Sequence, residues 1–593
     1  MDAMLGDPRT PEGLRKHLIR RAHGLRVQRS GMEPIWQEIA RFCQPTTNRF
    51  LNAYANTPNS AGHPALRQQV VLNTKLNDAR AIWAADVLSA GMYSGLTSPS
   101  RPWFKLKLKD PELAEFQSVK EWLDLLARRI YDLFATTNFY TMIRGGYHEL
   151  GLFGIEAGIM ERHWRYGLVV HPLMAGEYWI GLDDGLKPDS LYRRVDFTAL
   201  QHYEKFGRRI AAGKRAIDVL PRKVVEAYDR GDYDHTFTCM HAIEPNDLRD
   251  PRRLDALGKR YRSVYWSEAL DTNECTPEKA LLDQQGFDSK PFWTARWEVS
   301  GADVYASLSP GLRALADVRQ LQLQVLRKQQ ASDFMVRPAL RGPATLNNVH
   351  AALQPGRITA MAMIDKDSFG AIWEVSPQAI AALREDVLDT REAVDRGFYA
   401  DLFNAITNMR GVQPRNVEEI ASRNEEKLTQ LGPVVERVHD EKLRVCIDRA
   451  SEIVMPTMPP PPEGLHGMSL ETEFISVLAQ AQRLVGLGGI ERTFGFASSI
   501  AQAYPDALDA LDADAAMDEY ADIVGAPAKM VRSPEERNKL RAERQQAQQA
   551  QQQAAQMAAA APAVKAGAEA AKILYDSPGV GSQPSLAERL LGQ

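Results

Sequence analysis

Residues 376–406 read SPQAIAALREDVLDTREAVDRGFYADLFNAI, and this stretch decides the fold. Ser376 followed by Pro377 indicates a helix start, because serine caps the first free N–H groups and proline is tolerated at the first helical position. Beyond this start, apolar residues recur at three- and four-residue spacing, as on one face of a helix. They are Ile380, Leu383, Val387, Val394, Phe398, Leu402 and Ile406. The stretch predicts one amphipathic helix of about nine turns.

A short turn follows this predicted helix. Residues 408–415 read NMRGVQPR. Gly411 and Pro414 interrupt the helical pattern, since glycine is costly in a helix and proline pushes the residue before it into an extended conformation. The turn therefore predicts a tight loop that carries two arginines, Arg410 and Arg415.

Helical spacing resumes at Val417 and runs to Ile447, with one interruption at Gly432 and Pro433. A proline inside a helix removes one hydrogen bond and clashes with the preceding turn, which costs about 3 kcal/mol unless packing compensates. The sequence therefore predicts a kink in the helix at these two residues.

Motifs in this loop and helix resemble the head-to-tail connector, or portal protein, of short-tailed bacteriophages. Segments elsewhere in the chain agree with the same family, in the family's order. The motifs are QPRNVEEI at 413–420, RNEE at 423–426, LGPV at 431–434, SGLTSPSRPWF at 94–104, VY at 304–305 with PGLRALAD at 310–317, and LAQAQ at 478–482. The resemblance covers residues 31–532, which is most of the chain.

The resemblance implies a portal-type fold of the α+β class that is predominantly helical. Such a fold has a wing, a stem, a β-rich clip and a helical crown. The implied parts begin with an N-terminal wing of helices and strands (1–210), a first stem helix (211–234), a β-rich clip (235–303) and a second stem helix (304–332). A continuation of the wing follows (333–456), with a tunnel loop (408–416) and a long kinked helix. The chain then forms a helical crown (457–532) and a Gln/Ala-rich helical tail or barrel (533–593).

The resemblance also implies a function. The chain would form a closed dodecameric ring at one vertex of a phage capsid, as a structural protein without enzymatic activity or a cofactor. Double-stranded DNA would pass non-specifically through its channel during packaging and ejection. The implied protein partners are the large terminase, tail adaptor or nozzle proteins, the major capsid and scaffold proteins, and internal core proteins, with no membrane. A tail or adaptor ring that never translocates DNA is the alternative.

Arg410 and Arg415 are the residues that the resemblance would direct toward DNA, because it implies that their turn is the tunnel loop. One arginine repeated around a ring makes a collar of positive charge, while an acidic surface elsewhere keeps phosphates from binding tightly. Such a channel favours sliding over tight binding. Pairing of these arginines with Glu418, Glu419 or a neighbouring subunit is the alternative.

Residues 310–330 have the spacing of another long helix, in which cations lie beside apolar residues. The resemblance implies that this helix is part of the stem. Arg327 and Lys328 are therefore candidates to face the lumen.

Composition agrees with a large multidomain protein. The chain has 593 residues, of which 44% are hydrophobic, so it can bury a large core. Its formal charge of −4 gives no overall basic footprint of the kind that drives tight binding to duplex DNA. The N-terminus has no apolar signal core, and no run approaches about 18 consecutive apolar residues. We therefore expect a soluble protein made in the cytoplasm, and the resemblance implies that it becomes part of the virion.

Catalytic and metal-binding motifs are missing from the sequence. It has no GxxxxGK[ST] phosphate loop and no HExxH pair, and we predict no metal site. The acidic run Asp506, Asp509, Asp512, Asp514 and Asp518 lacks the glycine and the glutamate of a calcium-binding EF-hand, so we interpret it as a solvated helix face near a helix start.

The four cysteines lie far apart and have no CxxC spacing. They are Cys43, Cys239, Cys275 and Cys446. We expect buried, reduced thiols rather than a disulfide framework or a zinc site.

Local patterns predict the remaining elements. Helices are expected over 11–42, over 76–90 with Leu76, Ala79, Trp83, Val87 and Ala90 on one face, and over 119–134. Strands are expected at 104–108, between 158 and 197 with a hairpin turn at Asp183-Asp184-Gly185, and at 237–243, 261–266 and 292–299 as a small β subdomain. Close packing is expected at Gly151, Gly154 and Gly158. The five prolines of 455–462 predict a stiff hinge. A last helix is expected to run from Ser533-Pro534 into the Gln/Ala tract of 545–561.

Lys105 and Lys107 alternate with apolar residues in the first of these strands. Outward-facing lysines of this kind either contact DNA or form a solvated strand face that protects a sheet edge from aggregation. We interpret them as the solvated face.

Overall fold

The computed structural model describes two compact units, Met1–Arg492 and Thr493–Gln593. The described residues are 10–45, 76–108, 116–207, 216, 220–267, 281–306, 308–338, 340–342, 358–360, 370–371, 374–407, 431–462, 470–475, 493–497, 499, 511–517, 536–553 and 572. Helices and several antiparallel sheets make up these residues, so the chain belongs to the α+β class with a majority of helix, as predicted.

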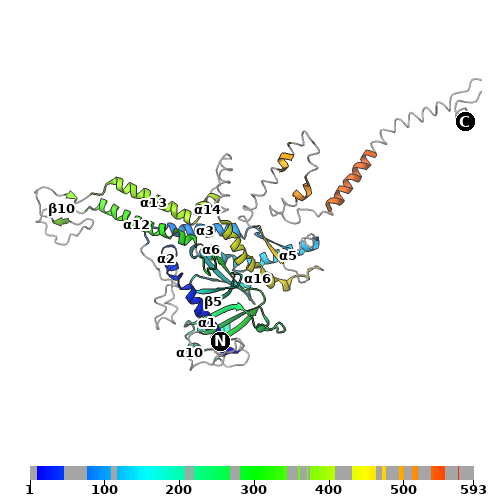
Figure 1. Ribbon diagram of the computed structural model, residues 1–593, viewed down its shortest axis with the longest axis horizontal. Helices are drawn as coiled ribbons and strands as arrows, with labels where there is room; N and C mark the ends of the chain where they lie inside the picture. The colour runs from blue at the N-terminus through cyan, green and yellow to red at the C-terminus, as the bar shows by residue number, and fades with distance from the viewer. Residues whose placement is uncertain are drawn as a thin grey trace, which may run out of the picture. The chain divides into compact units, whose positions relative to one another are not determined.

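Helices surround the main core of the first unit (Figure 1). They are α1 (Pro11–Arg29), α2 (Glu33–Cys43), α3 (Arg80–Leu96), α5 (Gln117–Thr136) and α6 (Phe139–Phe153). The predicted apolar face of α3 is wrong, because its buried side consists of Ala81, Ala84, Ala85, Leu88 and Met92. The Trp83 side chain is 38% exposed, and the Arg80 guanidinium carbon lies 3.9 Å from the ring centroid. Small alanines allow close approach to α6, which the hydrophobicity of single residues does not reveal.

A three-stranded antiparallel sheet follows α6 directly. Its order is β3-β2-β9, with β2 (Ile155–His163), β3 (Gly167–Leu173) and β9 (Phe292–Arg296). Gly154 has φ 74°, a left-handed conformation that ends α6 and starts β2. A Cβ at Gly158 would lie 2.2 Å from the Trp293 ring, and one at Gly151 would lie 2.6 Å from Leu88. The predicted close packing of these glycines is confirmed.

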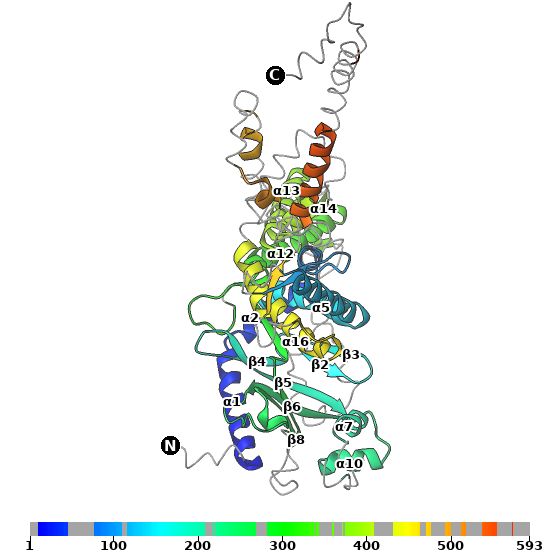
Figure 2. The same cartoon turned by 90° about the vertical axis from the view of Figure 1, so that its right-hand side faces the viewer.

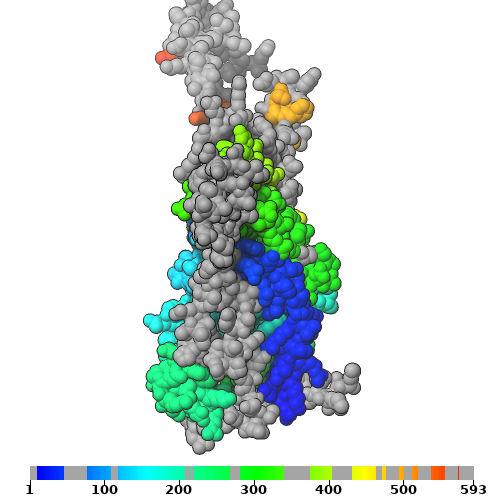
Figure 3. Space-filling view, turned by 90° about the vertical axis from the view of Figure 1, so that its left-hand side faces the viewer, coloured from blue at the N-terminus to red at the C-terminus, as the bar shows by residue number. Residues whose placement is uncertain are grey.

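A five-stranded antiparallel sheet lies between α1 on one face and two short helices on the other (Figure 2). Its order is β4-β5-β6-β7-β8, with β4 (Tyr178–Leu182), β5 (Pro188–Thr198), β6 (Thr236–Pro245), β7 (Tyr261–Ser267) and β8 (Leu281–Phe287). Alternate residues face opposite layers: Met240 packs toward α1, whereas Cys239 packs toward α7 (Ala199–Phe206) and α10 (Arg222–Asp229). The outer side of α1 is open to solvent in the space-filling view (Figure 3).

The strands predicted between residues 235 and 303 form, but they do not make a separate β subdomain. β6 pairs with β5, and β9 pairs with β2, so both sheets combine strands from before and after residue 210. The hairpin predicted at Asp183-Asp184-Gly185 is confirmed between β4 and β5, where the Lys187 N–H donates to Asp183 Oδ1 at 2.7 Å. The positive φ of this turn belongs to Leu186, at 60°, rather than to Gly185. A short 3₁₀ turn, η3 (Ala256–Gly258), lies between β6 and β7.

Two long helices pack side by side and form an arm (Figure 1). They are α12 (Pro310–Val336) and α13 (Pro377–Gly397), and three very short strands lie between them in sequence: β10 (Leu340–Gly342), β11 (Ile358–Ala360) and β12 (Gly370–Ala371). The predicted start of α13 is confirmed, because the Ser376 hydroxyl accepts a hydrogen bond from the Ala379 N–H. Its predicted nine-turn length is wrong: Tyr399 has φ 56°, and a separate helix, α14 (Ala400–Thr407), follows.

The last part of the first unit begins with a helix at residue 431. Residues 431–438 are helical, and a π-helical turn follows, η5 (His439–Leu443). The helix then continues as α16 (Arg444–Val454) and ends in a 3₁₀ turn, η6 (Met455–Thr457). The Trp122 Nε1–H then donates to the Pro459 carbonyl at 3.1 Å. The proline-rich segment therefore lies within the first unit.

Two strands that are distant in sequence form a two-stranded sheet in this unit. β13 (Leu470–Phe474) pairs antiparallel with β1 (Phe104–Leu108), whose alternating burial confirms the predicted strand. Lys107 Nζ lies 2.9 Å from Glu473 Oε2 on β13. This contact supports the strand-face interpretation of the lysines.

Described residues of the second unit are helical at 493–497, 513–517 and 536–553. Asp512 Oδ1 accepts hydrogen bonds from the Asp514 and Ala515 N–H groups at 3.0 and 3.1 Å, which confirms a helix start at the acidic run. The Asp514 carboxylate pairs with Arg541 at 2.7 Å. Ser533 and Pro534 lie outside the described residues.

Three of the cysteines are free and buried, as predicted. They are Cys43, Cys239 and Cys446, whereas Cys275 lies outside the described residues. Burial raises the pKa of the Cys43 thiol to about 12.

Candidate functional site

The root of the α12–α13 arm is tightly packed into the first unit. A Cβ at Gly397 would lie 3.0 Å from Ala314 Cβ, and one at Gly311 would lie 2.3 Å from the Leu152 carbonyl oxygen. Glycine is therefore required at both positions for the helices to approach this closely. The Ser309 hydroxyl accepts from the Leu312 N–H and donates to the Leu152 carbonyl, which fixes the start of α12 on α6.

Ion pairs and amide hydrogen bonds join the same root to α3. Arg391 Nη2 lies 2.6 Å from Asp78 Oδ2, and Arg80 Nε donates to Asp395 Oδ1 at 2.8 Å. The Gln322 side-chain oxygen accepts from the backbone N–H groups of Asn77 and Asp78 at 2.8 and 3.1 Å. These contacts link α12, α13 and the start of α3 into one rigid junction.

The distal half of the arm differs sharply from the root. No residue of 323–336 on α12 or of 377–386 on α13 is buried. The predicted lumen residues lie here: the structure places Arg327 on α12 with an exposed side chain and Lys328 beside it, half-buried. Neither makes an ion pair with any residue in the described ranges. The structure therefore leaves both cations available to a group outside the subunit.

Arg410 and Arg415 lie outside the described residues, as do Glu418 and Glu419. The segments on both sides of their loop are anchored. In α14, the Phe403 ring fills the space beside Gly91, where a Cβ would lie 2.1 Å from the ring. On the far side, Leu431 and Val435 are buried in the main core. The described elements that precede and follow residues 408–430 are thus both anchored in the main core.

Gly432 and Pro433 are helical, but the residues before 431 are outside the described ranges, so the kink predicted there stays a prediction. The irregular turn that the structure does define in this helix is the π-helical segment η5 (His439–Leu443). Its position was not predicted from the sequence. The signal that could have found it is the five-residue step between the buried Val438 and Leu443, where a regular α-helix has a spacing of three or four.

The π-turn directs two consecutive charged side chains into the same three-stranded sheet. Lys442 Nζ donates to Glu156 Oε2 on β2 at 2.7 Å, and the Lys442 and Glu156 side chains are 0% and 1% exposed. Arg296 Nη2 on β9 donates to Glu441 Oε1 at 2.6 Å. Consecutive residues of a regular α-helix point about 100° apart, so the extra residue of a π-turn makes this double contact possible.

Further groups surround the buried pair. The Trp293 Nε1–H donates to Glu156 Oε1 at 3.2 Å, and Lys442 Nζ lies 3.6 Å from the Tyr147 ring centroid. Burial lowers the pKa of Lys442, while the charge of Glu156 and its hydrogen bond act in the opposite direction. The pair is well enough satisfied to remain buried, and it ties the helix after the loop to the sheet.

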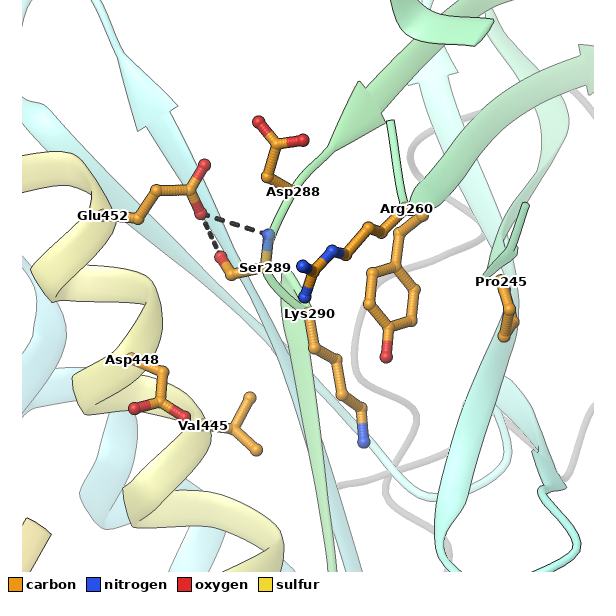
Figure 4. A pocket seen from close by; sticks show the side chains of 9 residues that line it. Pro245, Arg260, Asp288, Ser289, Lys290, Val445, Asp448 and Glu452 are labelled. Carbon is orange, nitrogen blue, oxygen red and sulfur yellow. Dashed lines mark hydrogen bonds between the residues drawn. The ribbon is translucent and has the colours of Figure 1, made fainter. Parts of the chain in front are cut away.

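A pocket of about 700 Å³ lies between α16 and the ends of β7 and β9 (Figure 4). Ser289 Oγ donates to Glu452, which also binds Arg449 Nη1 at 2.7 Å. Burial lowers the pKa of Lys290 to about 8. The pocket is lined by Pro245, Arg260, Tyr261, Asp288, Ser289, Lys290, Val445, Asp448 and Glu452, so it has charges of both signs and no histidine to activate its serine. Its composition indicates a packing groove rather than a catalytic centre.

Metal-binding clusters and membrane-spanning helices are both absent from the described part of the chain. There, no group of three or more His, Cys, Asp or Glu side chains could hold a metal ion. None of the helices described is both long and apolar enough to cross a membrane.

Comparisons with known proteins identify the family to which the chain belongs. Residues 15–531 match the family described as "Bacteriophage head to tail connecting protein". This chain belongs to the portal family. It is 34% identical over 533 residues to the portal protein of Salmonella phage epsilon15. This alignment covers 89% of this chain and 91% of that protein. The chain is also 34% identical over 521 residues to the probable portal protein of Bordetella phage BPP-1, which covers 87% and 88% of the two chains.

Membership of the portal family has direct consequences. Portal proteins are structural components of the virion at a capsid vertex, not enzymes. They form oligomeric rings that contact the capsid, DNA and terminase. Arg327, which makes no ion pair with a residue in the described ranges, therefore has to be considered together with the neighbouring subunits of a ring.

Proposed function

We propose that this chain forms a closed dodecameric ring at one capsid vertex and that double-stranded DNA passes along its axis. Portal family membership over residues 15–531 carries this proposal. A cyclic ring is built from head-to-tail contacts, so each subunit needs two different complementary faces. The subunit would be made in the host cytoplasm and then built into the virion.

We assign the stem of this ring to α12 and α13, and the clip to β10, β11 and β12 between them. This assignment differs from the ranges 211–234, 235–303 and 304–332 that the sequence predicted for stem, clip and stem. Two observations support the change. α12 and α13 are the long helices that flank a small β unit, whereas the range 211–234 contains the eight-residue α10. The strands of 235–303 belong to the large sheets.

The loop after α14 is our candidate for the tunnel loop, with Arg410 and Arg415 directed at the DNA. The anchored ends of this loop, at Phe403 and Leu431, support a role as a fixed constriction. Arg327 and Lys328 on the distal stem are second candidates for the lumen, because both are unpaired within the described subunit. One positive collar in a channel of otherwise acidic protein favours sliding of phosphates over tight binding.

The proposed partners follow from the two ends of the ring. The clip would meet the large terminase during packaging and later the tail adaptor or nozzle. The wing would meet the major capsid and scaffold proteins, and the crown, residues 457–532, would meet internal core proteins. The Gln/Ala-rich tail, 533–593, would extend the crown as a helical barrel.

Arg410→Ala combined with Arg415→Ala tests the conduit. We expect rings of normal mass and symmetry but a severalfold loss of packaged or retained DNA, since each subunit loses its contribution to the collar. The measurement is the DNA content of purified particles together with native mass spectrometry of the rings. The matched control is Arg396→Ala, which removes an exposed arginine at the end of α13. Wild-type DNA content in the double variant would contradict the assignment.

A further inference from the structure

The tip of the β2–β3 hairpin exposes aromatic side chains to an unusual extent. Trp164 is 85% exposed and Tyr166 is 58% exposed. Of the other tryptophans in the described ranges, Trp83 is 38% exposed and the rest are buried at 8% or less. Single exposed apolar residues are ordinary on protein surfaces. Two large aromatic side chains on one three-residue turn need a further explanation.

This tip is held in a fixed shape before it meets any partner. His163 Nδ1 accepts hydrogen bonds from the backbone N–H groups of Arg165 and Tyr166 at 3.2 and 3.3 Å. The His163 ring stacks on Tyr166 with centroids 5.0 Å apart, and the Arg165 guanidinium carbon lies 5.5 Å from the Tyr166 centroid. Gly167 closes the turn with φ 75°, a conformation that suits glycine. Such an ordered tip loses little conformational entropy when it binds.

Charge indicates the chemistry of the partner. Arg162 and Arg165 lie on the tip, and no acidic residue occurs between 162 and 167. Glu161, the acidic residue just before the tip in sequence, pairs with His171 and Lys205 at 3.8 and 4.0 Å. A partner surface with an acidic rim would complement this tip.

Composition indicates the type of contact. Trp, Tyr and Arg are the residues most enriched at the centres of protein–protein interfaces. Permanent contacts between copies of one chain are more apolar and contain few charges, whereas later, non-obligate contacts mix aromatic and charged groups as this tip does. Duplex DNA keeps its bases stacked inside, so it offers no ring for Trp164 to stack on.

We propose that Trp164, Arg165 and Tyr166 form a docking knob that enters an apolar slot with an acidic rim on the protein shell enclosing the ring. The proposal rests on the proposed ring function and adds a contact to it. The indole fills the slot, the tyrosine ring lines its edge, and the Arg162 and Arg165 guanidinium groups pair with carboxylates of the rim. Desolvation of the indole supplies most of the affinity, as at interface hot spots.

Hydroxyl-radical footprinting with mass spectrometry tests this proposal on four samples: free subunits, purified rings, DNA-free particles assembled with the same phage's shell and scaffold proteins, and DNA-filled particles. We expect oxidation of Trp164 and Tyr166 to be equal in subunits and rings and to fall at least fivefold in both kinds of particle. Protection already in the purified ring would assign the tip to a second copy and overturn the proposal. Protection only in filled particles would assign it to DNA, and equal oxidation in all four samples would leave it without a partner; both results overturn the proposal.

Substitutions give an independent test. Trp164→Ala should leave rings intact and reduce the number incorporated per particle about tenfold, the size of an interface hot-spot effect. The matched control is Leu254→Ala, which truncates a side chain that is 95% exposed on the β6–β7 connection and should change nothing. Equal incorporation of Trp164→Ala and wild-type rings would overturn the proposal. Failure of the wild-type chain itself to form rings or enter particles would instead contradict the proposed function.

Discussion

The two halves of the α12–α13 arm differ in how their charged side chains are paired. At the root, and at the π-turn behind it, charged groups are paired. Three of these pairs have a buried member: Lys442 with Glu156, Glu441 with Arg296, and Arg391 with Asp78. In the distal half, charged side chains are exposed or half-buried and make no ion pair with any described residue. They are Arg327, Lys328 and Asp333 on α12 and Arg384, Glu385 and Asp386 on α13.

This difference indicates where each half finds its partners. A buried charge must be paired within the subunit, because the cost of desolvating it cannot otherwise be recovered. An exposed charge stays hydrated and remains free to contact another molecule. The root therefore holds one geometry within a single subunit, whereas in our proposal the distal half is completed in the ring or by DNA.

Removing the buried lysine should produce the largest effect on stability. Lys442→Met keeps the volume but leaves the Glu156 carboxylate buried without a counter-charge. We expect the free energy of unfolding to fall by about 3–5 kcal/mol. Guanidinium denaturation at fixed subunit concentration measures it.

The control for this prediction removes both charges. Glu156→Gln together with Lys442→Met should recover most of the lost stability, since neither buried charge remains. If the single and double variants were equally unstable, packing rather than the ion pair would explain the effect.

A pH effect of similar size is expected at Glu149 on α6. Burial raises the pKa of this carboxyl to about 7, although hydrogen bonds from Ala175 N–H and Gln44 act to lower it. The folded state therefore binds a proton more tightly than the unfolded state, whose pKa is near 4.5. Between these two pKa values the free energy of unfolding falls as the pH rises, by at most about 1.4 kcal/mol per pH unit.

Glu149→Gln should remove this pH dependence. The Gln44 side-chain oxygen is buried and has no hydrogen-bond partner among the described residues. If the Gln44 side-chain amide is flipped, so that its oxygen and nitrogen exchange places, this oxygen can accept a hydrogen bond from a protonated Glu149 or from a glutamine at position 149. Thermal unfolding between pH 5 and 8 tests the prediction across the pH window in which Glu149 titrates. An unchanged slope in the variant would show that another group titrates.

Loss of the second ion pair should have a smaller effect. In Glu441→Gln, the buried Arg296 loses the negative charge of its partner, while the glutamine amide oxygen can still accept one hydrogen bond from it. We expect a loss of about 1.5–3 kcal/mol and faster hydrogen exchange in residues 431–454. Exchange that speeds up only at the arm tip would contradict the role of Glu441 as an anchor of this helix.

The distal arm should respond least as a folded subunit. Arg327→Ala with Lys328→Ala should change the stability of the subunit by no more than about 0.5 kcal/mol, because neither residue is buried or makes an ion pair with a described residue. The same variant should alter ring formation or DNA content, measured by native mass spectrometry and in purified particles. A large loss of subunit stability would remove the contrast between the two halves.

Elements defined by local chemistry were predictable from the sequence. The Ser376 cap, the start of α12, the strand at Phe104–Leu108 and the close packing of glycine at Gly154 follow from spacing and residue type within a few positions. Portal motifs gave the family. These features need no knowledge of distant partners.

Features that depend on distant contacts were missed or wrong. The break at Tyr399 interrupts an otherwise continuous apolar stripe. The pairing of β6 with β5 and of β9 with β2 joins strands that are separated in sequence by other elements. The buried Glu441 and Lys442 look like an ordinary solvated helix face, since only the π-turn directs them inward. Arg410 and Arg415 stay predictions, because their loop lies outside the described residues.

Cryo-electron microscopy of the purified protein, viewed down the symmetry axis, tests ring closure and the placement of the arm together. We expect a closed ring of twelve subunits whose lumen is wide enough for duplex DNA. The duplex is about 20 Å across, and its major groove alone is roughly 12 Å wide. The α12 and α13 helices should line the narrow part, with their distal charges against neighbours or the lumen. Subunits that never close, or rings whose distal arms lie outside and free in solvent, would contradict the ring and the assignment of the stem.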